Sequence, residues 1–361
     1  MPSKLDSLTG LRALLAGMVL VAHACLRVGW LEGPGWVAHL ASQLGHFGVI
    51  GFFILSGLIL RTVYGQRPWT IREFAGNRFA RIYPLYLCGL LFTLPIDWFS
   101  PGFAPIHKEA ALGLNAVTLQ AWFGFANGRF NGPGWSVEVF FYACFPALLL
   151  LQNRSKAAFA GLGVMLFVVT AMIWDPGGFA TSYRFPAWRL WEFMLGMSVA
   201  DLMVRLPKPG NWCWALALTV LFAALLLGGT VLWVPGWHFA GWVLMAAGAC
   251  ACIVLLGAAD VQGTAWRPLS SPQWVLGGEI SYGVYLFHDG AQRYAKVAVE
   301  RALATGIETT ALTVKLGYMI GTTVATVGMA YICWKWLEMP ARVKLRAIFG
   351  KAARGQGGVR A

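Results

Sequence analysis

An arginine and a histidine interrupt an otherwise apolar stretch near the start of the chain. The stretch LTGLRALLAGMVLVAHACL reads as a membrane-spanning helix, yet it contains Arg12 and His23. Their spacing is very nearly three helical turns, so both side chains are expected on one helix face, roughly 16 Å apart along the axis. Ionisable groups in hydrocarbon are costly, which makes function the default hypothesis for both. The structural alternative is that Arg12 reaches lipid phosphate and His23 hydrogen-bonds a neighbouring helix.

Two further arginines precede the third apolar stretch. Arg78 and Arg81 lie three residues apart in REFAGNRFARIYPLY, so they share a face if this piece is helical. Two guanidiniums near the predicted position of Arg12 suit a polyanion such as a phosphate chain. Ordinary positive-inside charge, or binding of anionic lipid, is the alternative explanation. The chain has no GxxxxGK(S/T) loop and no GxGxxG motif opening a helix after a strand, so nucleotide hydrolysis and dinucleotide redox chemistry lack support.

Three later stretches also carry ionisable residues inside apolar sequence. Glu138, in GPGWSVEVFFYACFP, is expected about one turn inside the outer end of a span, where a carboxylate needs a partner or water. Arg189 and Glu192 are three residues apart, and we expect them to neutralise one another in a structural role. His288 lies well inside GEISYGVYLFHDG, beside Asp289. A packed and satisfied histidine is favoured there over a catalytic one.

Composition excludes an ordinary soluble domain. Of the 361 residues, 58% are hydrophobic and only 12% are charged, a balance typical of a polytopic membrane protein. The formal charge of +13 falls mostly in short loops and near the C-terminal end, which indicates positive-inside topology rather than nucleic-acid binding. The seven cysteines lie inside apolar stretches without CxxC or metal-ligand spacing, so no metal site is predicted.

Apolar runs of spanning length predict an all-α bundle of about ten transmembrane helices. Lysine and arginine are richest in the loops that would be inside if both termini are cytoplasmic. The mildly apolar segment 100–133 is expected to be external or re-entrant. One membrane domain is predicted over 1–340, followed by a short basic cytoplasmic tail over 341–361 whose last part, KAARGQGGVRA, is expected to be disordered. The ten candidate spans lie near 11–30, 46–64, 82–99, 134–152, 157–174, 185–204, 212–232, 237–259, 274–296 and 311–337.

Several separated motifs resemble those of the integral-membrane acyltransferase-3 family. The resemblance covers nearly the whole chain, from LDSLTGLRALLAGMVLVAH to WKWLEMPAR, and includes GFFILSGLIL, RLWEFMLGM and ISYGVYLFH. One departure is Val139, which stands where many relatives have a polar or acidic residue, and this weakens any mechanism that needs two carboxylates there. The family's arginine-to-histidine spacing matches Arg12 and His23, its arginine pair matches Arg78 and Arg81, and its tryptophan-serine-x-glutamate motif matches Trp135, Ser136 and Glu138.

The resemblance implies transfer of an acyl group, often acetyl from acetyl-CoA, to a hydroxyl of a carbohydrate. It implies that Arg78, Arg81 and Arg12 hold the phosphates of acyl-CoA at the cytoplasmic face. His23 would then act as the general base, for which its ordinary pKa near 6.5 is suited, or would carry the acyl group itself. Glu138 would orient the imidazole or bind the acceptor.

The remaining expectations concern substrates and location. Trp135, Ser136 and His288 are tentative substrate-binding residues. The implied partners are acyl-CoA, a carbohydrate acceptor and the lipid bilayer, with no metal and no nucleic acid, and the implied location is a bacterial inner membrane. The sequence leaves open the acceptor, the acyl chain, the oligomeric state and the choice between direct transfer and an acyl-enzyme.

Other functions remain open from the residues themselves. A secondary transporter of an anionic sugar derivative would also keep arginine, histidine and glutamate inside a bundle. If the protein is such a transporter, we expect substrate flux without consumption of acyl-CoA. A non-catalytic assembly component would make Arg12 and His23 structural, and acylation of a small secondary metabolite is an alternative within the acyltransferase interpretation.

Overall fold

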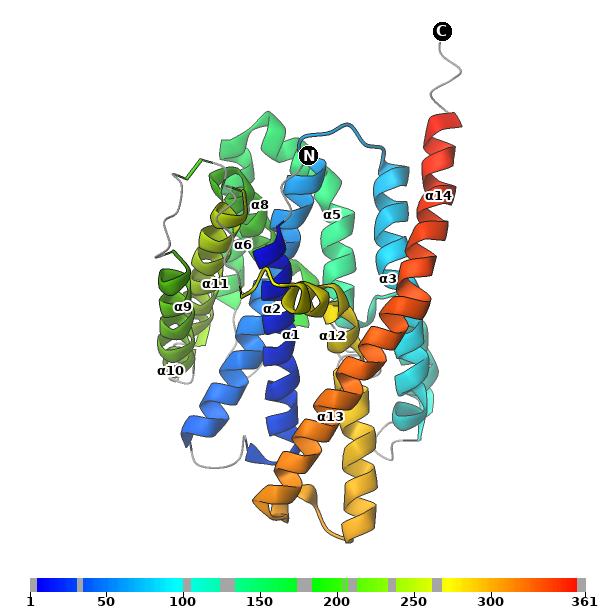
Figure 1. Ribbon diagram of the computed structural model, residues 1–361. Coiled ribbons are helices and arrows are strands. Elements are labelled where there is room, and N and C mark those ends of the chain that lie inside the picture. Colours follow the sequence, from blue (N-terminus) through cyan, green and yellow to red (C-terminus); the bar gives the residue numbers. More distant parts are fainter. Residues whose placement is uncertain are drawn as a thin grey trace.

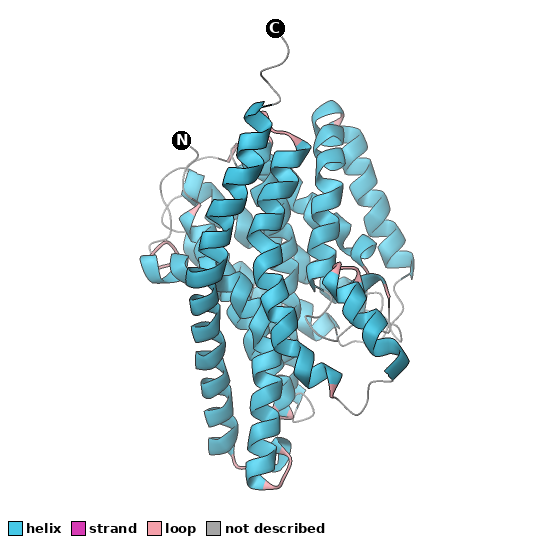
Figure 2. Cartoon of the chain, turned by 90° about the vertical axis from the view of Figure 1, so that its right-hand side faces the viewer, coloured by secondary structure: helices cyan, strands magenta, loops and turns pink. Residues whose placement is uncertain are grey.

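The computed structural model is a bundle of helices (Figure 1). It describes residues 5–30, 35–99, 105–123, 134–173, 184–203, 205–206, 213–232, 238–261 and 268–355. A view turned by 90° shows helices and loops in these residues and no strand (Figure 2). Among them, seven helices are long and apolar enough to cross a membrane. The all-α, multi-pass class predicted from composition is therefore confirmed.

The elements follow one another with short connections. The α-helices of the first half are α1 (Asp6–Arg27), α2 (Gly35–Tyr64), α3 (Ile71–Trp98), α4 (Pro105–Ala116), α5 (Gly134–Arg154) and α6 (Lys156–Ile173), with a 3-10 turn η2 (Gln120–Trp122). The second half contains η4 (Pro186–Arg189), α8 (Leu190–Met203), α9 (Cys213–Ala223), η5 (Ala224–Gly228), α10 (Gly229–Leu232), α11 (His238–Val261), α12 (Pro272–Leu303), η6 (Ile307–Thr309), α13 (Leu312–Cys333), η7 (Trp334–Glu338) and α14 (Met339–Gly355).

Local sequence explains where the two helices nearest the site begin. At the start of α3, the Thr70 side chain accepts a hydrogen bond of 3.1 Å from the Glu73 amide, so a donor that the helix cannot satisfy is capped. At the start of α12, Pro272 occupies the first turn, where its missing N–H leaves no bond unmade. The last turn of α12 is followed by Ala304 in the left-handed conformation.

Helices α1, α3 and α12 run side by side in the same direction. The Tyr282 hydroxyl donates to the Ile82 carbonyl at 2.7 Å, and the Gln292 amide donates to the Leu20 carbonyl at 3.0 Å. In Figure 1 these three helices run downward, while α13 and α14 return upward. We call the end of the bundle where α1, α3 and α12 begin the arginine end, and the opposite end the far end.

The count of ten spans stays a prediction. Seven predicted spans correspond to helices that pass the length and apolarity test. The other three regions are helical but atypical. The helix α8 has 14 residues, roughly 21 Å. The predicted span 212–232 contains the π-helical stretch η5. The helix α12 is long enough, at 32 residues, but it carries several charged side chains.

The segment after α3 turns back into the bundle. Lys108 on α4 donates to the Trp98 carbonyl at 2.6 Å, and the Tyr83 hydroxyl donates to the Ala116 carbonyl at 3.1 Å. Trp98 and Tyr83 are roughly 22 Å apart along α3, so α4 follows α3 inward from the far end. This supports the re-entrant interpretation of 100–133, of which 100–104 and 124–133 lie outside the described residues.

The boundary predicted at residue 341 falls inside a helix. A π-helical turn, η7, joins α13 directly to α14, and α14 remains helical to Gly355. The helix packs along α3 so closely that a Cβ on Gly76 would collide with the Phe349 ring. The first part of the predicted tail therefore belongs to the bundle, and the helix extends to Gly355, while the disorder expected for the end of the tail stays a prediction and 356–361 lies outside the described residues.

A close contact of backbones joins α1 to α12. A Cβ added at Gly278 would lie well inside van der Waals contact of the Thr9 carbonyl oxygen. We expect Gly278→Ala to lower stability by about 1–3 kcal/mol, because the two helices must separate to admit the methyl group. Thermal unfolding of the detergent-purified protein measures this loss.

Gly321→Ala on α13 is the matched control, since nothing lies within 4 Å of a Cβ at that position. It should be neutral or slightly stabilising, because alanine is a better helix former than glycine. Equal melting temperatures for the two variants would contradict the role assigned to Gly278.

Candidate functional site

A cavity of about 280 Å³ lies between the helices at the arginine end. Its lining combines four arginines, two glutamates and several aromatic side chains. The three arginines predicted to bind a polyanion all line it, although they come from helices far apart in the sequence. The lining residues used below are Arg12, Arg78, Arg81, Glu138, Tyr142, Trp135, Glu279, Tyr285 and Arg346.

The three predicted arginines form no close ion pair in the part of the chain that the structure describes. Within the described residues, none of Arg12, Arg78 and Arg81 makes an ion pair within 4 Å. The Arg78 guanidinium lies over two rings, with its carbon 5.7 Å from the centroids of both Tyr64 and Tyr142. Three guanidinium groups that converge on one cavity, none of them within 4 Å of a carboxylate in the described residues, favour binding of an anion with more than one charge.

Glu138 lies with the arginines. It follows the first turn of α5, as predicted, and its carboxylate accepts a hydrogen bond from the Tyr142 hydroxyl one turn later. It is close enough to Arg12 and Arg81 to be among the charges that act on both. No contact between Glu138 and His23 occurs among the described residues, so the structure gives no support to the expectation that Glu138 orients the His23 imidazole.

The tryptophan and the serine of the same motif have different surroundings. Trp135 lines the cavity and packs edge-on against Tyr282 and Tyr285, at centroid distances of 4.1 and 5.7 Å. Ser136 is buried and does not line the cavity. Of these two motif residues, only Trp135 can therefore touch a molecule that fills this cavity.

His23 and His288 face each other deeper in the bundle. Their ring centroids are 4.7 Å apart, with the planes inclined by 71°. Since a carbonyl oxygen can only accept, Nδ1 of His23 donates to the Val19 carbonyl at 2.9 Å, and Nδ1 of His288 donates to the Tyr285 carbonyl at 2.6 Å. With Nδ1 donating, each ring in its neutral form has its lone pair on Nε2, which is the nitrogen that can take up a proton.

Tyr285 connects the histidine pair to the cavity. It lines the cavity, and its ring centroid is 5.6 Å from that of His288. The histidines themselves do not line the cavity. The order from the arginine end is therefore the arginines, then Glu138 and Trp135, then Tyr285, and finally His288 with His23.

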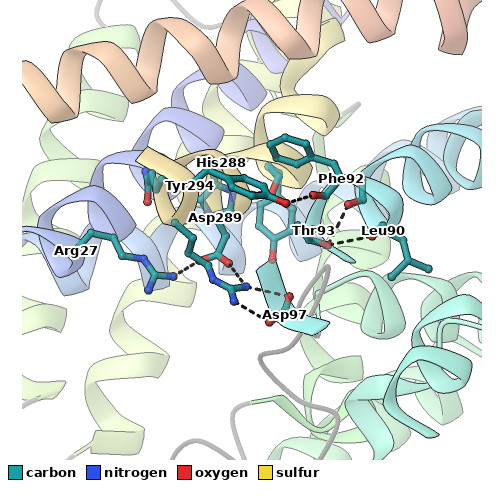
Figure 3. A network of polar contacts seen from close by, with 12 residues as sticks. Arg27, Leu90, Phe92, Thr93, Asp97, His288, Asp289 and Tyr294 are labelled. Carbon is teal, nitrogen blue, oxygen red and sulfur yellow. Dashed lines mark hydrogen bonds and ion pairs between the residues drawn. The ribbon is translucent and has the colours of Figure 1, made fainter. Parts of the chain in front are cut away.

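Ion pairs at the far end hold the helices that carry the two histidines (Figure 3). Asp289 pairs with Arg27 of α1 and lies 3.7 Å from Arg293. Arg293 also makes two bonds of 2.8 and 3.0 Å to the buried Asp97 of α3. The network links α1, α3 and α12 next to His288. Only Asp289 stood out in the sequence, since its partners are far away along the chain.

Arg189 and Glu192 pair as predicted. Both side chains are fully buried, with 2.9 Å between Nη2 and Oε2. The Arg189 guanidinium also lies 4.5 Å from the centroid of the Trp242 ring. The predicted pairing is therefore confirmed, and its position outside the cavity lining agrees with the structural role expected of it.

Of the nine cavity residues named above, four were not singled out from the sequence. Tyr142 and Tyr285 gave no signal beyond aromatic residues in apolar helices. Glu279 opens the stretch GEISYGVYLFHDG and could have been noticed as a carboxylate at the start of a span. Arg346 was counted as positive-inside charge in a tail.

Comparison with known proteins decides the class. A family model described as an acyltransferase domain matches residues 5–335. The chain belongs to the acyltransferase-3 family. This acyltransferase assignment confirms the resemblance seen in the motifs and favours an enzyme over a transporter or a scaffold. The matched region includes the cavity residues of α1, α3, α5 and α12, and it ends before α14 begins.

Two curated relatives extend over most of the acyltransferase. The exopolysaccharide production protein ExoZ of Rhizobium meliloti (strain 1021) is 26% identical over 293 residues, which is 74% of this chain and 84% of the relative. The acyltransferase MdmB of Streptomyces mycarofaciens is 28% identical over 327 residues, which is 81% of this chain and 80% of the relative. No solved structure matches the chain.

Proposed function

We propose that this acyltransferase moves an acyl group, acetyl in the simplest case, from cytoplasmic acyl-CoA to a hydroxyl of a carbohydrate. The observation that carries the proposal is the series from unpaired arginines, through an aromatic-lined cavity, to a histidine pair. The arginine end would face the cytoplasm of a bacterial inner membrane, in agreement with the loop charges. No group of three or more potential metal ligands occurs among the described residues, and the proposed chemistry uses none.

The arginines are assigned to the phosphates of coenzyme A. Arg12, Arg78 and Arg81 supply fixed donors and positive charge at the mouth of the cavity. The uncharged pantetheine arm would follow the aromatic wall formed by Trp135 and Tyr285. The distance from Arg12 to His23 along α1 is roughly 16 Å, so the thioester would lie well away from the phosphates.

His23 is assigned as the general base for direct transfer. Its Nε2 takes the proton of the acceptor hydroxyl while that oxygen attacks the thioester carbonyl carbon. The carbon–sulfur bond then breaks, and the leaving sulfur takes the proton back from the imidazolium, which yields the ester and free coenzyme A. His288, whose ring faces His23, would stabilise the protonated imidazole through its own Nε2 lone pair.

Removal of the base should abolish catalysis. His23→Ala is expected to lower acyl transfer from radiolabelled acetyl-CoA by about 10²- to 10⁴-fold, because the hydroxyl then has no group to take its proton. The assay uses purified protein that elutes as a single species in detergent. His46→Ala is the control, since it also removes an imidazole that donates to a carbonyl of its own helix. Near-normal turnover by His23→Ala would refute the assignment.

Removal of the arginine pair should weaken donor binding. The double variant Arg78→Ala and Arg81→Ala is expected to lose at least about 10-fold in affinity for coenzyme A, because charge-assisted hydrogen bonds to phosphate are lost. Calorimetry with the purified protein measures this change. Arg61→Ala is the control, since its charge is already paired with Asp201 at 3.1 Å. If the double variant bound coenzyme A with unchanged affinity, the proposal would be refuted, and the two arginines would be explained by positive-inside topology alone.

The acceptor is proposed to be a cell-surface glycan, on the ground that one relative is named for exopolysaccharide production. Mass spectrometry of surface glycans should show one acyl group fewer when the wild-type gene is replaced by the His23→Ala form. Complementation with the wild-type gene should restore it. An unchanged glycan, with an acyl group missing instead from a small secreted metabolite, would contradict the carbohydrate acceptor.

A further inference from the structure

The helix α14 adds a guanidinium to the cavity from outside the region matched by the family. The family match ends at residue 335, and α14 begins at Met339. Arg346 nevertheless lines the cavity together with Arg78 and Arg81. Its side chain is exposed, and it has no hydrogen bond or ion pair with any part of the chain that the structure describes.

Contacts on both sides of Arg346 hold it in place. One turn earlier, Arg342 lies 3.6 Å from Glu279 of α12 and 3.4 Å from Glu338 of η7. One turn later, the Phe349 ring packs on Gly76 of α3. Since α14 is fixed to two neighbouring helices, Arg346 is positioned rather than carried on a free tail.

The positive charges around Arg346 favour binding of an anion at the mouth of the cavity. The positive charges of Arg78 and Arg81 act on Arg346, and they are only partly offset by the charge of Glu279, whose carboxylate lies 3.6 Å from Arg342. Arg342, by contrast, already has two carboxylates. Like charges at this spacing repel one another unless an anion lies between them. Arg346 therefore adds a fourth guanidinium to the cavity and favours an anion at its mouth.

Depth along the bundle identifies which anion this is. From Glu279 to His288 is roughly 13 Å along α12, and Arg346 is one further helical turn, about 6 Å, beyond the level of Arg342 and Glu279. Phe349, one turn beyond Arg346, lies against Gly76, which places Arg346 near the level of Arg78, on the side of the cavity away from the histidines. In coenzyme A the thioester and the 3′-phosphate are at opposite ends, and the diphosphate lies between them.

We propose that Arg346 of α14 binds the 3′-phosphate of coenzyme A, while Arg12 and Arg81 hold the diphosphate. This proposal rests on the proposed function, because it takes acyl-CoA as the donor with its thioester near His23. It assigns the last helix a part in donor selection, namely discrimination between acyl-CoA and donors that lack the 3′-phosphate.

The test compares acetyl-CoA with acetyl-3′-dephospho-CoA, which differs only in the missing phosphate. Calorimetry with the full-length protein in detergent gives both affinities. Wild-type protein should prefer acetyl-CoA by about 10- to 100-fold, the range expected when a hydrogen bond to a charged group is made. Arg346→Ala should bind acetyl-CoA more weakly by that factor and acetyl-3′-dephospho-CoA unchanged, so that the preference disappears. At saturating acetyl-CoA, kcat should stay the same while KM rises.

Lys344→Ala is the matched control, because Lys344 is an exposed cation on α14 that does not line the cavity. It should leave both affinities unchanged. Equal losses for both donors in Arg346→Ala, or no loss for either, would overturn the proposal while leaving the acyltransferase function intact. Wild-type protein that binds neither donor would overturn the proposed function and this proposal with it.

Discussion

The close, parallel packing of α1 against α12 is the constraint on which the site depends. Gly278 lets the two backbones approach until the Thr9 carbonyl occupies the space of a missing side chain. Because the helices run in one direction, the start of α1 meets the start of α12, and the two histidines meet deeper in the bundle. The Arg27–Asp289 pair fixes the same alignment at the far end. One interface thus sets the register of both chemical regions.

The two ends of this interface differ in whether carboxylates of the protein neutralise the arginine side chains. At the far end, Arg293 is bonded to Asp97 and lies near Asp289, so positive charge is neutralised inside the protein. At the arginine end, Arg12, Arg78 and Arg81 have no ion pair in the described part of the chain. Unpaired buried charges are costly, so they are typical of sites where a bound ligand supplies the opposite charge. The unpaired arginines at the arginine end fit such a site.

Local spacing predicted the parts of the site that lie on one helix. The helical period placed Arg12 and His23 on one face, and the Arg189–Glu192 pair was predicted from its spacing alone. Spacing carries no information on which helices are neighbours. The His23–His288 contact therefore could not be derived from the sequence. The number of spans was uncertain for a related reason, since several charges of α12 are neutralised by partners on α1, α3 and α14 that are far away in the sequence.

The separation between the arginines and the histidines follows from the different hydration of the two ends of the proposed acyl-CoA donor. Phosphates lose a large hydration free energy when they are buried, so they must stay where guanidiniums replace water. The pantetheine arm and the thioester carry no charge, and they can enter an aromatic-lined interior without that loss. A base placed among the arginines would have its protonated form disfavoured by their charge. Placing the histidines roughly 16 Å from Arg12 along the helix axis keeps the proton-accepting Nε2 atoms away from the field that binds the phosphates.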